Sequence, residues 1–431
     1  MPWSAAPTNG GAGTGLVAPL LAAVVVMWAF VTFPPAVAEL NADASLNAVL
    51  HYAAEHDFQF GSELVSTYGP LGFLIFPHYS AHALGLRMVT DVLVCFAVAA
   101  GLCLVAWRLR WVWRVLLVGV FLWTTANVWL RTDLVLQMGL FCWGLLSLVE
   151  RGRQVEVSAL VYSLFAAFCG LAKVSFLFMG AAGLALLVLS LVLNGRRRLA
   201  LVVVGVFWAA FFCGWIAAGQ QIDNAGPFIQ RGLSVALSYN AALGVEGLQS
   251  VRPAGFASAV LALGVVILRC WGAGDPGQEQ KRLLWHRLLL FAWSFLFAFT
   301  IWKHGFVRGD TWHVGFFLAF VPLLMFALES VPTPNRLLGF WARVVSMTTA
   351  ALPLLALQVF IFPPLPGSFI EPGALFRSNL QRMVKPGEYA RVAARFLHAN
   401  QRASQLPRFR QIVGSGAVDV FGQHQAYALY N

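Results

Sequence analysis

Charged residues are scarce in this 431-residue chain. They make up 11% of it, whereas soluble domains carry about a quarter, so an ordinary soluble globular domain is excluded. Among the charged residues the acidic ones are fewer, with 18 Asp and Glu against 29 Lys and Arg. Cysteine is scarce as well. The six cysteines stand in apolar runs or at their edges, which argues against a disulfide framework or a zinc knuckle.

Apolar residues are abundant instead. They make up 59% of the chain, and its 35 Phe and 16 Trp exclude a disordered chain, so we expect no nucleic-acid partner. Because a spanning helix needs about 20 mainly apolar residues, the sequence predicts an all-α polytopic membrane bundle of about 11 transmembrane helices. The expected spans are 15–33, 86–107, 115–130, 134–149, 158–172, 175–193, 199–218, 255–268, 288–302, 314–328 and 344–362.

The distribution of charge predicts how this bundle is oriented. With the N-terminus in the cytoplasm, the inner loops hold fourteen basic and five acidic residues, and the outer loops hold seven basic and ten acidic residues. Basic residues concentrate on the cytoplasmic side of membrane proteins. We therefore expect an N-in, C-out protein of the bacterial cytoplasmic (inner) membrane, in which the net charge of +11 is mostly an orientation signal.

Two regions stand apart from the spans. In the membrane domain, 1–362, residues 34–85 form a first periplasmic loop with a surface helix, and residues 363–431 form a C-terminal periplasmic segment. In that segment we expect a helix at 388–400 and short strands at 411–414 and 417–421, hence a small α/β tail. About 70 residues are few for an independent domain, so the tail is either a truncated part of a longer protein or a lid that packs on the membrane part.

The first loop carries one group of candidate site residues. Asp43, Asn47 and His51 recur every four residues and form a polar stripe beside an apolar one, as on a helix that lies along the membrane surface. Glu39 and Asp43 follow the first span, where a carboxylate is placed to accept the proton of an attacking hydroxyl. From spacing alone, stabilisation of the first turn of that helix is the favoured role of Asp43.

The turn at 302–313 carries the second group. Lys303, His304, Arg308, Asp310 and His313 stand together on the side where cations are disfavoured. Lys and Arg suit a phosphate, because Arg offers a bidentate fork and Lys a point charge. The alternative is a solvated turn in which Arg308 pairs with Asp310. No spacing fits a metal-ligand motif, so we predict no metal site; a divalent cation is compatible with the sequence but not indicated.

Other single residues also attract attention. Lys173 interrupts an apolar stretch, and it either extends to the interface or contacts a lipid phosphate. Tyr68 precedes a Gly-Pro turn that returns the chain to the membrane, and it suits an interfacial anchor. Asp91 is expected to pair with Arg87 one turn earlier. We expect a similar local pair between Arg131 and Asp133, just before the fourth span.

These motifs resemble those of the GT-C class of polytopic glycosyltransferases, which use polyprenyl-phosphate sugars as donors. Asp43 follows the first span as an acidic motif does in that class. Tyr68-Gly69-Pro70-Leu71 matches its "GPL" turn, and Gly170-Leu171-Ala172-Lys173 looks like its "GLA…TK" turn. The class usually has adjacent acids, whereas Glu39 and Asp43 are four residues apart. Residues 60–74 also resemble a segment of uncharacterised bacterial multi-pass membrane proteins.

The resemblance implies transfer of a sugar from a lipid-linked donor to an envelope glycan, lipid or protein on the periplasmic face. It implies Asp43 and Glu39 as catalytic acids, with donor-phosphate binding by Lys303, Arg308 and Lys173. The supporting residues would be His51, Tyr68, His304, Asp310 and His313. Three other interpretations stay open: a membrane transporter or flippase, an O-antigen polymerase or ligase-like protein, and a structural subunit of an envelope complex.

Overall fold

The computed structural model describes residues 24, 42–75, 79–128, 130–150, 152–243, 251–272, 280–331, 333, 336–403 and 411. Their regular structure is helical, and they hold no strand beyond two isolated bridges. The α-helices are α2 (Ala42–Glu55), α3 (Leu84–Trp107), α4 (Trp111–Asn127), α5 (Arg131–Val149), α6 (Arg153–Ala172), α7 (Val174–Leu193), α8 (Arg197–Ala217), α9 (Ala225–Leu243), α10 (Arg252–Gly272), α11 (Gln280–Arg308), α12 (Thr311–Leu328), α13 (Arg336–Phe360), α14 (Gly367–Val384) and α15 (Pro386–Ala403). Two 3-10 helices, η1 (Gly72–Leu74) and η2 (Ile222–Asn224), complete them.

The expected all-helical architecture, with several helices suited to cross a membrane, is confirmed. Within the described ranges, nine helices are long and apolar enough to cross a membrane: α3, α5, α6, α7, α8, α10, α11, α12 and α13. Helix α4 has only 17 residues, and it coincides with the expected span 115–130. The expected span 15–33 lies outside the described residues except for Val24. The chain is therefore a multi-pass helical membrane protein, and ten of the eleven expected spans correspond to a helix.

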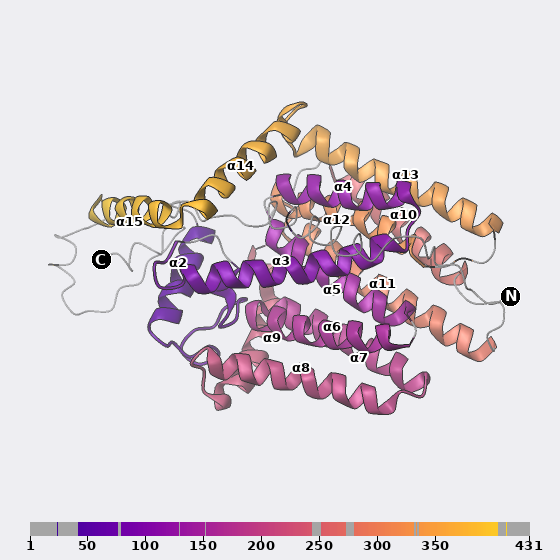
Figure 1. The fold of residues 1–431 in the computed structure, drawn as a ribbon, viewed down its shortest axis with the longest axis horizontal. Helices are drawn as coiled ribbons and strands as arrows, with labels where there is room; N and C mark the ends of the chain where they lie inside the picture. Colours follow the sequence, from indigo (N-terminus) through magenta and orange to yellow (C-terminus); the bar gives the residue numbers. More distant parts are fainter. Residues whose placement is uncertain are drawn as a thin grey trace.

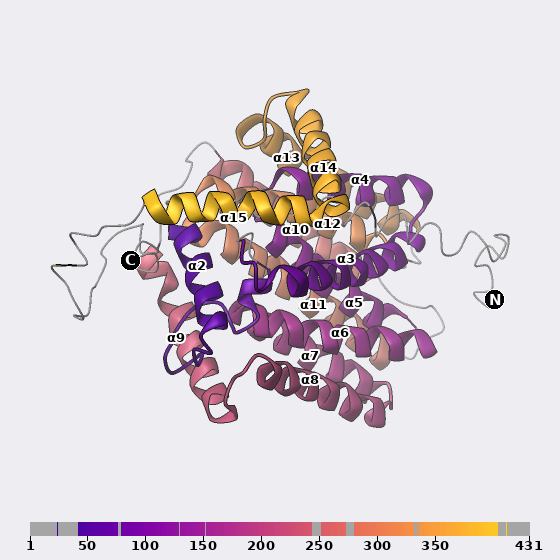
Figure 2. The ribbon, with the colours of Figure 1, turned by 60° about the vertical axis from the view of Figure 1, so that its left-hand side comes forward.

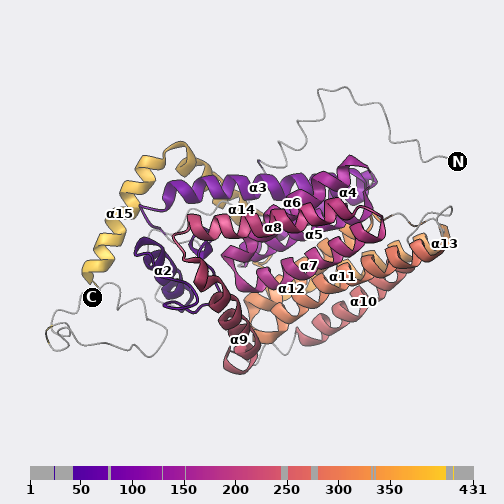
Figure 3. The same ribbon diagram turned by 90° about the horizontal axis from the view of Figure 1, so that it is seen from below.

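The helices lie side by side, and successive spans run in opposite directions (Figure 1). Their ends fall into two sets. One set, which we term the α2 end, holds α2, η1, α9 and the first residues of α5, α7 and α12 (Figures 1 and 3). The other set, the arginine end, holds the opposite termini and is defined by Arg108, Arg110, Arg153, Arg196, Arg197, Arg198, Arg269 and Arg343.

The interior of the bundle is formed by α5 and α12. Every residue of α12 from Val314 to Leu328 is buried, and so is every residue of α5 from Asp133 to Leu148. Helices that are apolar all round belong inside a bundle. The outer helices instead expose large apolar side chains, such as Leu93 on α3, Leu201 on α8 and Val359 on α13. Lipid contact accounts for this exposure, because such a surface would be costly in water.

The tail differs from its sequence-based prediction. Residues 367–403 form two helices, α14 and α15, where one helix at 388–400 was expected. Gln411 is helical, and the other residues of the expected strands lie outside the described residues. The tail packs on the membrane part, since Asn127 Nδ2 donates to the Ser368 carbonyl at 3.0 Å and Tyr79 Oη to the Ala390 carbonyl at 3.2 Å. Figure 2 shows α15 at the same end of the bundle as α2.

Candidate functional site

Six polar side chains meet inside the α2 end, and we term them the polar cluster. They come from the first turn of α5, the junction of α6 with α7, the end of α11 and the start of α12. The members are Asp133, Lys173, His304, Arg308, Asp310 and His313.

A buried ion pair forms the inner part of the polar cluster. Lys173 Nζ donates to Asp133 Oδ2 at 2.5 Å, and the two side chains are only 10% and 8% exposed. Lys173 is the single residue between α6 and α7, and its extended backbone, with φ −151°, ends one helix and begins the next. His304 Nε2 lies 3.5 Å from the same Asp133 oxygen. Asp133 is in the first turn of α5, where the helix dipole favours a carboxylate.

A second carboxylate forms the outer part of the cluster. Asp310 is the N-cap of α12, and its Oδ1 accepts the His313 N–H at 2.9 Å and lies 2.7 Å from His313 Nδ1. Arg308 Nε lies 2.8 Å from Asp310 Oδ2. Burial by itself raises the pKa of Asp310, but the two bonds from His313 and the nearby charges of His313 and Arg308 outweigh it, so the pKa lies below its ordinary value.

The two parts of the cluster join through stacked histidines. The rings of His304 and His313 have centroids 5.3 Å apart and an interplanar angle of 28°. The cluster therefore forms a continuous series of groups: Lys173, Asp133, His304, His313, Asp310 and Arg308. Histidines between carboxylates can hold or pass on a proton, and ionisable groups within spans mark functional paths by default.

The segment 67–74 covers the polar cluster. The Gly69 N–H donates to the Ala172 carbonyl, the Leu71 N–H to the Leu171 carbonyl, both at 3.1 Å, and the Val174 N–H to the Thr67 carbonyl at 2.9 Å. Lys173 Nζ lies 5.2 Å from the ring centroid of Tyr68, a cation–π distance. The two motifs that carry the resemblance are thus bonded to each other through their backbones.

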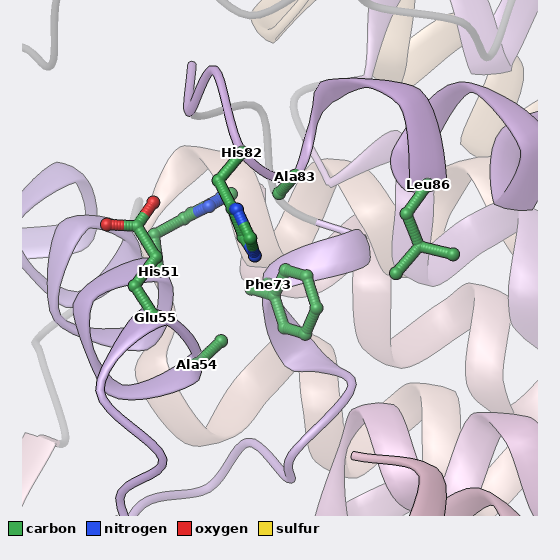
Figure 4. Close-up of a pocket in the computed structure, with 7 residues that line it drawn as sticks. All are labelled: His51, Ala54, Glu55, Phe73, His82, Ala83 and Leu86. Carbon is green, nitrogen blue, oxygen red and sulfur yellow. The ribbon is translucent and has the colours of Figure 1, made fainter. Parts of the chain in front are cut away.

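A pocket of about 100 Å³ adjoins this segment at Phe73, and we term it the α2 pocket. His51 and Glu55 of α2, Phe73 of η1 and His82 line it (Figure 4). The buried His51 ring meets Phe73 edge-on at 5.7 Å, and Glu55 Oε1 accepts the Ser80 hydroxyl at 2.6 Å. Figure 4 shows the His82 ring directed into the space beside Phe73. His51, the last residue of the polar stripe, therefore lines a pocket at the α2 end.

The structure brings together most of the residues that the sequence singled out. Lys173, His304, Arg308, Asp310 and His313 lie in the cluster, with Tyr68 against it. His51 lies in the α2 pocket instead, and Lys303 is exposed on α11. Asp43 is the second residue of α2 and therefore lies in its first turn, the position that its spacing predicted. The Asp43 side chain and all of Glu39 lie outside the described residues.

Two local interpretations are corrected by the structure. Asp133 pairs with Lys173 rather than with Arg131, because residues two apart on a helix point in different directions. Lys173 does not extend to the interface, because it is buried against that carboxylate. The pairs Arg87–Asp91, at 3.7 Å, and Arg308–Asp310 are confirmed. Sequence reasoning missed Asp133 as a site residue. The sequence did contain a signal: Asp133 and Lys173 each stand inside an apolar stretch, where a charged side chain requires a partner.

Among the described residues, no group of three or more His, Cys, Asp and Glu is placed to hold a metal ion. Comparisons of the chain with protein-family models, with curated proteins and with solved structures found no match.

Proposed function

We propose that the chain is an integral membrane glycosyltransferase similar to the GT-C class. It transfers a sugar from a polyprenyl-phosphate donor to an envelope acceptor at the α2 end, which is the periplasmic side of a bacterial cytoplasmic membrane. One observation carries the proposal: the 67–72 segment is bonded to the α6–α7 junction and thereby places Lys173 in a buried polar cluster. Two short motifs that are some hundred residues apart thus form one unit.

The proposed reaction needs a base and a stabilised leaving group. The acceptor oxygen forms a bond to the anomeric carbon while the bond from that carbon to the phosphate oxygen breaks. The phosphate leaves with the electron pair, and the acceptor proton passes to a carboxylate. Asp43, with Glu39 as the second candidate, fits the role of base because α2 begins at Ala42, beside the expected end of the first span.

The cations divide into two roles. Lys173 and Arg308 each have a carboxylate partner, so they position the histidines and the start of α12. Lys303 is exposed on α11 next to His304, and it is the candidate for direct contact with the donor phosphate. A cation near the leaving oxygen would stabilise the charge that develops on it.

A transport function is the second candidate. The series of ionisable groups from Asp133 through His304 to His313 also suits a proton relay in a transporter or flippase. The α2 pocket, however, opens beside α2 and is not lined by these residues.

The test of the proposal is Asp43→Asn in vesicles supplied with a lipid-linked sugar donor. Loss of a general base lowers transfer by about 10²–10⁴-fold. The control is Asp223→Asn, which removes an exposed carboxylate at the same end of the bundle and is expected to retain transfer. Equal transfer by both variants would remove Asp43 from the role of base. Movement of the donor across the membrane without a new glycosidic bond would instead favour the flippase.

A further inference from the structure

A second pocket lies at the arginine end, far from the polar cluster along the bundle. Its volume is about 180 Å³, more than a single ordered water requires. Four arginines line it: Arg108 at the end of α3, Arg110 before α4, Arg269 in α10 and Arg343 in α13. The acid in its lining is Glu329, which follows α12.

In the part of the chain that the structure describes, the charges around this pocket do not balance. Glu329 pairs with Arg269, and its Oε2 also lies 3.8 Å from Arg343 Nε. Arg108 is held by Glu150, outside the pocket lining, through Nε to Oε1 at 2.7 Å and Nη2 to Oε2 at 2.5 Å. Among the described residues, the four pocket arginines thus have two carboxylate partners, Glu329 and Glu150, which leaves two positive charges in excess.

Arg269 adds a buried donor that lacks an acceptor. Its side chain is 2% exposed and that of Glu329 is 3% exposed. Within the described part of the chain, Arg269 Nε has no hydrogen-bond acceptor. A buried donor of this kind costs about 1–3 kcal/mol, more when it is charged. Arg269 is also a lining residue of the pocket, so the cost falls on a residue at its wall.

These arginines differ from those that only mark the cytoplasmic side. Arg197 and Arg198 are exposed at the start of α8, as topology anchors usually are. The Arg114 guanidinium is already used, because it donates to the carbonyls of Ala106, Trp107 and Leu109 at the end of α3. The pocket arginines instead surround a cavity and are in excess over their carboxylates.

We infer that this pocket binds a phosphate-bearing anion, either free phosphate or the headgroup of an anionic lipid. The forked guanidinium matches phosphate oxygens in a bidentate manner, and two excess positive charges complement a phosphate group. The site is independent of sugar transfer, because it lies at the opposite end of the bundle from the polar cluster.

The experiment measures the thermal midpoint of the purified full chain in neutral detergent against inorganic phosphate, at constant ionic strength. The pocket variant is Arg110→Gln with Arg343→Gln, which leaves the buried Arg269–Glu329 pair intact. The matched control is Arg197→Gln with Arg198→Gln, which removes the same charge at the same end. A second arm compares nanodiscs of phosphatidylglycerol with nanodiscs of phosphatidylcholine.

Bound phosphate raises the midpoint by mass action, and we expect the pocket variant to need about tenfold more phosphate than the control for the same rise. If only phosphatidylglycerol gives a rise that the pocket variant loses, the ligand is a lipid headgroup. The inference is overturned if the pocket and control variants respond equally to both probes, or if neither probe raises the midpoint of the unaltered chain.

Discussion

At the scale of single residues, the ion pair between Lys173 and Asp133 dominates the α2 end. A charge buried in the bundle is tolerated only with a partner, and removal of one partner leaves the other uncompensated. We therefore expect Lys173→Met to lower the free energy of unfolding by about 3–5 kcal/mol. Chemical unfolding of the purified protein in detergent measures this loss.

A double variant separates the effect of the charges of this pair from the effect of the volume that its side chains fill. Asp133→Leu combined with Lys173→Met removes both charges and keeps apolar volume, so it is expected to be more stable than Lys173→Met alone. The two single variants, Lys173→Met and Asp133→Leu, are measured beside it. If the loss of stability in the double variant equals the sum of the two single losses, the residues are not energetically coupled.

The sequence identified Lys173 and the 302–313 turn as candidate sites but not the contact that joins them. Hydropathy reveals that a lysine interrupts an apolar stretch, yet it does not reveal which acid lies opposite. Asp133 is forty residues earlier in the chain, and its contact depends on how α5 packs beside the α6–α7 hairpin. Tertiary pairing of this kind has no local signal.

At the scale of elements, the start of α12 depends on the ionised form of Asp310. Because the pKa of Asp310 in the folded state lies below the ordinary 3.8, its ionisation stabilises the fold above that pH, and the stabilisation is lost as the pH falls through the folded pKa. Asp310→Asn keeps an N-cap acceptor but does not ionise. We expect its stability deficit to be constant above pH 5 and to shrink towards pH 3. Parallel stability curves for the two proteins over this range would contradict the assignment.

The close contact of the 67–72 segment with the α6–α7 junction requires glycine at position 69. A Cβ there would lie 2.2 Å from the Leu171 carbonyl oxygen, so Gly69→Ala must separate the two backbones. Overpacking of this kind costs about 1–3 kcal/mol, and we expect the thermal midpoint to fall accordingly. The control is Gly119→Ala in α4, where nothing lies within 4 Å of the added Cβ. Alanine is the better helix former, so that variant should be neutral or more stable.

The sequence predicted the spans well and the other elements less well. Long apolar runs located ten helices, with ends up to eight residues from those observed, because a spanning helix extends beyond its apolar run into the polar residues at its ends. Helix α9 was not predicted, because Ala225–Leu243 mixes polar and apolar residues and packs against α7 and η2. Helix α14 was not predicted either, since Pro372 stands inside it.

At the scale of the whole molecule, an apolar belt separates two polar ends of different character. Among the described residues, the α2 end joins carboxylates, histidines and a few cations in the polar cluster, whereas the pocket at the arginine end has arginines in excess over their carboxylate partners. Both proposals depend on this asymmetry, because the lipid-linked donor is expected on one side of the membrane and the phosphate-bearing anion on the other.

The orientation of the bundle is itself testable with two cysteine variants. Ser62→Cys places a thiol on an exposed residue of the α2 end, and Arg198→Cys places one on an exposed residue of the arginine end. Because basic residues are retained on the cytoplasmic side, a membrane-impermeant maleimide should label Ser62→Cys in intact expressing cells. It should label Arg198→Cys only after the cells are permeabilised. The control is the unaltered chain, which measures the background labelling of its own cysteines, of which Cys213 is exposed. The reverse pattern would place the α2 end in the cytoplasm, and a periplasmic sugar transferase would then be untenable.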